Sequence, residues 1–182
     1  MSENDSARVD PGLRPRAFEA IVYGGVTVGI FDFLFAMIFN TIRGAVPIRI
    51  FQYVASGLIG RRAFEGGWST FLIGVLIHFF IAFTLATVYY LASLRLPTLI
   101  HRALMWGMVY GVLVYAVMNY VVIPLSAAPK LRFGLVSFAG QLLAHVIAIG
   151  PLLALINRRS ARKAARVAPY PIEALNQLDS AA

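Results

Sequence analysis

The chain has 182 residues, of which 59% are hydrophobic and only 13% charged, with a formal net charge of +8. A soluble domain has roughly 25% charged residues, so this chain lacks the polar surface that a soluble fold of its size needs. It has no cysteine, which excludes disulfides, iron–sulfur clusters and thiolate zinc sites.

The N-terminal region consists of a polar segment, residues 1–16, followed by a long apolar run, residues 18–42. A helix needs about 20 apolar residues to cross a bilayer, and this run is long enough. It is longer than the apolar core of a secretory signal and contains Asp32. We therefore predict an uncleaved first membrane span, preceded by a cytoplasmic N-terminus.

The next segment, residues 47–60, is too short to cross a bilayer but has an amphipathic helical pattern. Pro47 suits the first turn of a helix, and the Arg61–Arg62 pair suits the last. The pattern places Ile48, Phe51, Val54, Ala55 and Leu58 on one side and Arg49, Gln52, Tyr53 and Ser56 on the other. We predict an interfacial or re-entrant helix, which either connects two spans or covers the bundle as a lid.

Three further apolar runs, residues 68–94, 103–125 and 133–156, have the length of a membrane span. Backbone groups in hydrocarbon must bond within their own segment, so each run is predicted to be a helix. The expected fold is an all-α polytopic membrane protein with four transmembrane helices and one interfacial helix, in one membrane domain of residues 17–157. Two pairs of glycines, Gly25 with Gly29 and Gly107 with Gly111, have the spacing that allows close helix packing.

Residues 158–182 form a basic tail directly after the last span. With four spans, the N-terminus, the 95–102 loop and the tail share one side, which carries ten of the sixteen Lys and Arg residues. Cytoplasmic segments keep more positive charge, so both termini are predicted to be cytoplasmic. The tail residues expected to bind anionic lipid headgroups are Arg158, Arg159, Arg162, Lys163 and Arg166. No nucleic-acid-binding motif is present, so the expected partner is the phospholipid bilayer and not nucleic acid.

A few polar side chains interrupt the spans, and they are the candidates for handling protons, ions or a small solute: Asp32, His78, Tyr115, Asn119, Gln141 and His145. Their helical spacing predicts that they point into the bundle. Counting along the spans places Asp32, His78, Tyr115 and His145 at a common depth, roughly 13–18 Å from the outer boundary. Each could equally bridge two helices by a hydrogen bond. A carboxylate at this depth needs a proton, a cation or a donor, which makes Asp32 the first candidate.

Three functions fit these residues. In the first, Asp32 and the histidines relay protons or bind an ion or solute in transport. In the second, the chain is a structural or assembly partner whose glycine-lined faces bind other membrane helices. In the third, His78 and His145 ligate haem b in a membrane cytochrome. A non-haem metal on Asp32, His78 and His145 is a further alternative, although no close ligand spacing supports it.

The motifs of soluble enzymes are absent from the sequence. It contains no GxSxG, no HExxH and no phosphate-binding glycine loop, so we expect neither enzymatic activity nor a resident metal. Four short helices enclose little volume, so a homo-oligomer would be the easier way to build a pathway.

Three stretches of sequence carry a resemblance to known proteins. They are GGWSTFLIGVLIHFFIAFTLATVYYLA at residues 66–92, the following GxxxG span with MNYVVIPLS, and GQLLAHVIAIGP in the fourth span. In these the chain resembles small bacterial inner-membrane proteins of unknown function, loosely the YagU-like family. That family likewise has a histidine in one span, followed by a Tyr-containing helix end, and a histidine in a later span. The resemblance covers residues 66–156 and implies a bacterial inner membrane and a link to acid or envelope stress, but no catalytic residues.

Overall fold

The computed structural model describes residues 14–130 and 134–167. All regular structure within these residues is helical. Four helical segments are long and apolar enough to cross a membrane: Glu19–Ile42, Gly67–Arg95, Ala103–Leu125 and Leu135–Arg166. The predicted all-α fold with four candidate spans is confirmed. The outermost parts of the predicted terminal segments, residues 1–13 and 168–182, lie outside the described residues.

Within the described chain, three of the four spans contain a five-residue π-helical turn. The first span consists of η1 (Glu19–Tyr23) and α1 (Gly24–Ile42), and the second is the continuous helix α3 (Gly67–Arg95). The third consists of α5 (Ala103–Val117), η3 (Met118–Val122) and α6 (Ile123–Leu125). The fourth consists of α7 (Leu135–Ala144), η4 (His145–Ile149) and α8 (Gly150–Val167). Such widened turns are frequent at functional sites.

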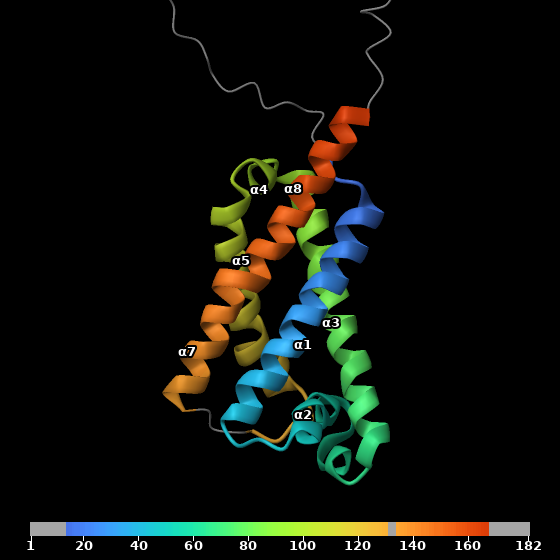
Figure 1. Cartoon of the computed structure of the whole chain (residues 1–182), viewed down its shortest axis with the longest axis vertical. Coiled ribbons are helices and arrows are strands. Elements are labelled where there is room, and N and C mark those ends of the chain that lie inside the picture. Colours follow the sequence, from blue (N-terminus) through green and yellow to red (C-terminus); the bar gives the residue numbers. More distant parts are fainter. Residues whose placement is uncertain (1–13, 131–133, 168–182) are drawn as a thin grey trace, which may run out of the picture.

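The four spans stand side by side, and consecutive spans run in opposite directions (Figure 1). The short helix α4 (Thr98–His101) connects α3 to α5 at the end where the described chain begins and ends. At that end the backbone N–H of Arg16 donates to Ser160 Oγ (2.9 Å), and Lys163 Nζ pairs with the Glu19 carboxylate (2.8 Å). The start of the first span is therefore attached to the last helix.

The glycine pairs bring two pairs of spans into close contact. Phenylalanine rings of α3 lie directly against Gly25 and Gly29 of α1, where a Cβ atom would overlap them. A Cβ atom on Gly107 or Gly111 of α5 would overlap the backbone of the fourth span, including the His145 carbonyl. The predicted close packing at these four glycines is confirmed. Because the chain uses them internally, they are not available to bind other membrane helices.

The helix α2 (Pro47–Ile59) and the 3-10 turn η2 (Gly60–Phe64) lie across the opposite end of the bundle (Figure 1). The backbone of α2 is seated on α3, since a Cβ atom on Gly74 would overlap the Phe51 carbonyl. Gln52 Nε2 donates to the Gly67 carbonyl (2.9 Å) at the start of α3. Gly67 has a φ of 57°, a left-handed conformation that favours glycine, so the chain turns sharply where α3 begins.

The two sides of α2 differ from the predicted pattern. Gln52 and Ser56, which were expected on the polar side, are buried, whereas Leu58 is 71% exposed. The backbone contact at Gly74 sets the rotation of α2. Gln52 Nε2 donates across to α3, and Ser56 Oγ donates to the Tyr53 carbonyl (2.6 Å). The apolar side of the helix therefore coincides with its packed side only in part, at Phe51 and Ala55.

The helix of the fourth span continues well beyond the expected apolar boundary at residue 156, because α8 ends at Val167. Residues 157–167 contain neither proline nor glycine and include several alanines, which favour helix. Asn157, Ser160 and Ala161 are buried against neighbouring elements, and Ser93 Oγ donates to Asn157 Oδ1 (3.4 Å). Packing therefore extends the last span into the basic segment.

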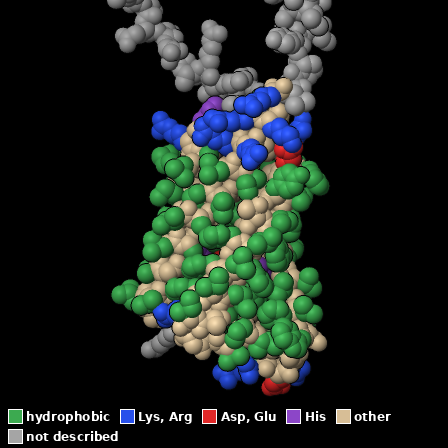
Figure 2. Space-filling view, viewed as in Figure 1, with side chains coloured by type: hydrophobic (Ala, Val, Ile, Leu, Met, Phe, Trp, Pro, Cys, Tyr) green, Lys and Arg blue, Asp and Glu red, His purple; other side chains and the backbone are tan. Residues whose placement is uncertain are grey.

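The surface of the bundle is divided by side-chain type. Figure 2 shows apolar side chains around the middle of the molecule and Lys and Arg side chains gathered at its ends. Large apolar side chains point outward, among them Leu76 and Phe80, which are each 71% exposed. A belt of exposed apolar side chains around helices of this length is what contact with lipid requires. These features are those of a membrane-embedded protein.

Candidate functional site

A cavity of about 690 Å³ lies between the four spans and α2. Polar side chains from every span line it: Asp32 on α1, His78 on α3, Asn119 on η3, Gln141 on α7 and His145 on η4. The structure therefore brings five of the six predicted site residues to one cavity. The sixth, Tyr115, is buried and does not line it, but its ring packs edge-on against the His145 ring with centroids 5.7 Å apart.

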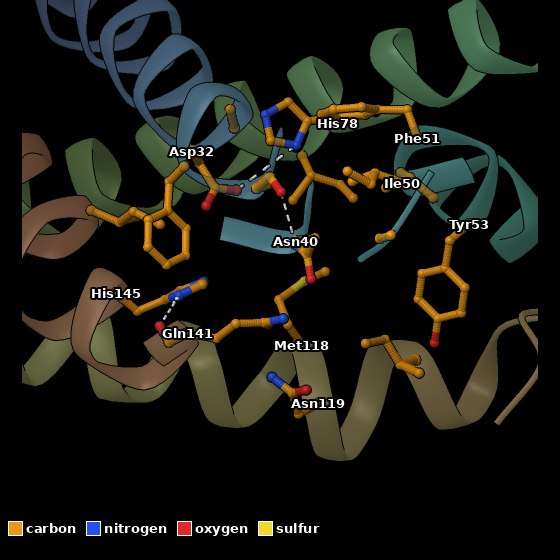
Figure 3. A pocket seen from close by; sticks show the side chains of 18 of the residues that line it. Asp32, Asn40, Ile50, Phe51, Tyr53, His78, Met118, Asn119, Gln141 and His145 are labelled. Atoms are coloured by element: carbon orange, nitrogen blue, oxygen red, sulfur yellow. Dashed lines mark hydrogen bonds and ion pairs between the residues drawn. The ribbon is translucent and has the colours of Figure 1, made fainter. Parts of the chain in front are cut away.

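Asp32 and His78 face each other from adjacent spans (Figure 3). His78 Nε2 lies 3.0 Å from the Gly29 carbonyl, and because a carbonyl can only accept, Nε2 carries a hydrogen. The other ring nitrogen, Nδ1, lies 3.8 Å from Asp32 Oδ2. The rings of Phe51 and Phe79 pack edge-on against the imidazole, with centroids at 5.3 and 5.5 Å. One turn of α1 thus contacts both ring nitrogens, Nε2 by a hydrogen bond and Nδ1 at ion-pair distance.

His145 lies on the opposite wall of the cavity, at the start of the π turn η4. Its Nδ1 donates to the Gln141 carbonyl (2.8 Å), which leaves Nε2 as an acceptor. Pro151, shortly after the turn, lacks an N–H, and its ring displaces the carbonyl four residues earlier, so the helix widens there. Gly111 leaves room for the His145 carbonyl on the neighbouring helix. The position of this histidine therefore follows from a proline and a glycine on two spans.

Two asparagines line the cavity in the same way. Asn119 Nδ2 donates to the Tyr115 carbonyl (2.9 Å), and Asn40 Nδ2 donates to the Ala36 carbonyl (2.8 Å). Each amide therefore uses one of its two N–H donors on its own helix and keeps the other, together with its side-chain oxygen, for a further partner. Asn40 is absent from the predicted site. It follows Asp32 by eight residues, a spacing that places both side chains on one helical face, so the sequence contains a signal for it.

The α2 end of the cavity contributes three polar residues that the sequence prediction did not assign to the site: Arg49, Tyr53 and Arg61. Arg49 Nη1 donates to the Phe64 carbonyl (3.1 Å), and its guanidinium lies over the Phe64 ring, 5.5 Å from the centroid. Tyr53 Oη donates to the Pro129 carbonyl (3.3 Å), and burial raises the pKa of this phenol above its ordinary value of 10.0. From the sequence alone, these three residues are interpreted as polar groups of an interfacial helix, because the sequence does not show that α2 lies over a cavity.

The cavity offers little for a metal or haem. Among residues 14–130 and 134–167, no group of three or more His, Cys, Asp or Glu side chains is placed to hold a metal ion. Asp32, His78 and His145 line one cavity without forming such a group, so the non-haem metal alternative has no support. Both nitrogens of His78 already face oxygen atoms, and haem ligation would require it to give up one of these contacts.

The basic residues expected to bind lipid lie on the last turns of α8. Arg159, Arg162, Lys163 and Arg166 are exposed, and Arg158 is half-buried. Figure 2 shows Lys and Arg side chains gathered at this end of the molecule. Lys163 differs from the others because it pairs with Glu19. Lipid binding by this cluster stays a prediction.

The chain matches no protein-family model, no curated protein and no solved structure. The resemblance to the YagU-like family therefore stays a prediction, and the function must be inferred from the cavity itself.

Proposed function

We propose that this chain is a non-enzymatic integral protein of a bacterial inner membrane that binds a small solute in the cavity, transports it across the membrane, and couples this transport to protonation of Asp32 and His78. The observation that carries the proposal is the contact of Asp32 Oδ2 with His78 Nδ1 at 3.8 Å on the cavity wall. The volume of about 690 Å³ lies within the range of small-molecule sites, roughly 300–1,000 Å³.

Coupling follows from the position of the pair. With one proton between them, Asp32 and His78 are either two neutral groups or an ion pair. The net charge is the same in both states, but its distribution along the cavity wall differs. A solute that interacts more strongly with one of these states shifts the proton between them or changes how many protons are bound. Solute and proton binding are then linked in both directions.

The proposed orientation places both termini in the cytoplasm. Support comes from the ten of sixteen Lys and Arg residues that lie on that side of the chain. With this orientation α2 lies at the outer surface, and the solute approaches the cavity past Arg49 and Arg61.

The test uses purified protein in liposomes that contain the pH dye pyranine. Gradients of small organic acids, amines and sugars are applied in turn, and proton movement is recorded. We expect at least one class of solute to move protons through the wild type, and Asp32→Asn to abolish this movement without lowering the folded yield. Glu65→Gln, which removes an exposed acid outside the cavity, is the matched control and should behave as wild type. Unchanged movement in Asp32→Asn, or none with any solute, would refute the proposal.

A further inference from the structure

The α2 end of the cavity carries positive charge. Arg49 and Arg61 line it, and the contact of Arg49 with the Phe64 carbonyl joins α2 to η2, the turn on which Arg61 lies. A guanidinium has five N–H donors, so the single bond to this carbonyl leaves Arg49 able to bind a further acceptor. Of the described residues that line the cavity, Asp32 is the one acid.

In the described part of the chain, the ion-pair contact of Asp32 is with His78 and not with either of these arginines. Asp32 precedes Asn40 by eight residues on α1, which corresponds to about 12 Å along the helix axis. Figure 3 shows Asp32 and His145 at one end of the cavity and Tyr53 at the other, with Asn40 between them. The two ends of the cavity are therefore electrically distinct.

The deep end of the cavity carries neither lysine nor arginine among the described residues that line it. Asn40 and Asn119 each use one of their two amide N–H donors on their own helix, and His145 Nδ1 donates to the Gln141 carbonyl. Asp32, the one acid of the lining, lies at this end and repels an anion when it is ionised. An anionic group is therefore favoured at the α2 end and disfavoured at the other.

Apart from these polar groups the lining of the cavity is largely apolar. Phe35 comes from α1, Ile81 and Leu85 from α3, and Val114 and Met118 from the third span. These side chains favour a hydrocarbon or aromatic body over a fully hydrated ion, because burying an ion against them would cost its hydration.

From this arrangement we infer that the cavity takes an amphiphilic organic anion, with its acid group at Arg49 and Arg61 and its apolar body along the spans. The inference rests on the proposed function in one respect, namely that the cavity binds a solute. A water-soluble organic acid and an anionic lipid share this chemistry, and the two sources are distinguished below.

The test compares three compounds of similar shape that carry a negative charge, no charge and a positive charge: 4-phenylbutyrate, 4-phenylbutanamide and 4-phenylbutylamine. Binding to the protein in phosphatidylcholine nanodiscs is measured by calorimetry, with empty nanodiscs subtracted. We expect the acid to bind at least tenfold more tightly than the amide or the amine. Addition of phosphatidylglycerol to the nanodiscs should weaken acid binding if the natural ligand is a lipid and leave it nearly unchanged if the ligand is water-soluble.

Substitution of the arginines tests the location of the acid group. Arg49→Gln and Arg61→Gln should each weaken acid binding at least fivefold and reduce the preference for the acid over the amide. Arg62→Gln, on the same turn but outside the cavity lining, should bind as wild type does. If a variant is not folded by gel filtration, the comparison of the three compounds on the wild type still decides the matter.

An amine that binds as tightly as the acid, equal binding of all three compounds, or binding of none would overturn the inference. Failure of the proposed function gives a different result. If acid preference persists but Asp32→Asn leaves proton movement in the liposome assay unchanged, the proton coupling is refuted and the ligand class stands. If coupling is retained but the cavity prefers the amine, the ligand class is refuted and the coupling stands.

Discussion

The contact of α2 with α3 at Gly74 permits a quantitative prediction for Gly74→Ala. A Cβ atom at this position would overlap the Phe51 carbonyl, which belongs to a helix backbone and cannot rotate away as a side chain would. Overpacking of this kind costs about 1–3 kcal/mol. Replacing a helical glycine by alanine contributes up to about 1 kcal/mol of stability in return. With the full propensity gain we therefore expect a net loss of about 0–2 kcal/mol relative to the wild type, together with a displacement of α2 away from α3.

Gly57→Ala is the matched control for this substitution. Gly57 also lies inside a helix, but its nearest neighbour would be Ser126 Cβ at 3.7 Å, an ordinary van der Waals distance. This variant should keep the propensity gain without the overlap, and should be as stable as the wild type or slightly more so. The assay is thermal unfolding of detergent-purified protein followed by circular dichroism. A chain of this length should shift by about 2–4 °C for each kcal/mol. If Gly74→Ala unfolds at or above the temperature of Gly57→Ala, α2 is not seated on α3 as described.

Two further predictions concern orientation and pH. Because the chain has no cysteine, Arg159→Cys and Arg62→Cys each introduce a single thiol, at opposite ends of the bundle. In intact spheroplasts a membrane-impermeant maleimide should label the Arg62→Cys thiol and not the Arg159→Cys thiol, and the reverse result would invert the proposed topology. Burial raises the pKa of Tyr53 above 10.0, so the stability that its protonated phenol contributes is present below pH 10 and is lost as the pH rises through the raised pKa. The difference in tyrosinate absorbance near 295 nm between the wild type and Tyr53→Phe should therefore rise with pH, with a midpoint above pH 10. A midpoint at or below 10 would show that the phenol is not buried.

The candidate spans were predictable because their length and hydropathy are set by the thickness of a bilayer, a constraint that needs no tertiary information. The helix of residues 47–60 was predictable for a similar local reason, since Pro47 starts it and Gly60, with a φ of 65°, interrupts it. Its rotation was not predictable, because the contact between Gly74 and the Phe51 carbonyl joins two backbones and does not depend on the apolar pattern of α2.

Some residues of the candidate site could be predicted from the sequence and others could not. Asp32, His78 and His145 stand out in the sequence because ionisable groups are rare inside apolar spans. Arg49 and Arg61 do not stand out, since arginine near a span end is ordinary in a membrane protein. Their assignment to the cavity needs the position of α2. The π turns at Met118–Val122 and His145–Ile149 were not assigned from the sequence, although Pro124 and Pro151 each follow one of them by two residues.

The attachment of the first span to the last affects the order in which the protein can be completed. Val28 of α1 packs in one apolar cluster with Ala86, Ile149 and Leu153. Synthesis proceeds from the N-terminus, so two members of this cluster are made more than 100 residues after the first. Until the fourth span is inserted, the first has an uncovered seam and the cavity lacks the wall that holds His145. A nascent chain stalled after the third span therefore leaves the deep polar groups without the helix that covers them, and their exposure to lipid costs free energy until the fourth span is inserted.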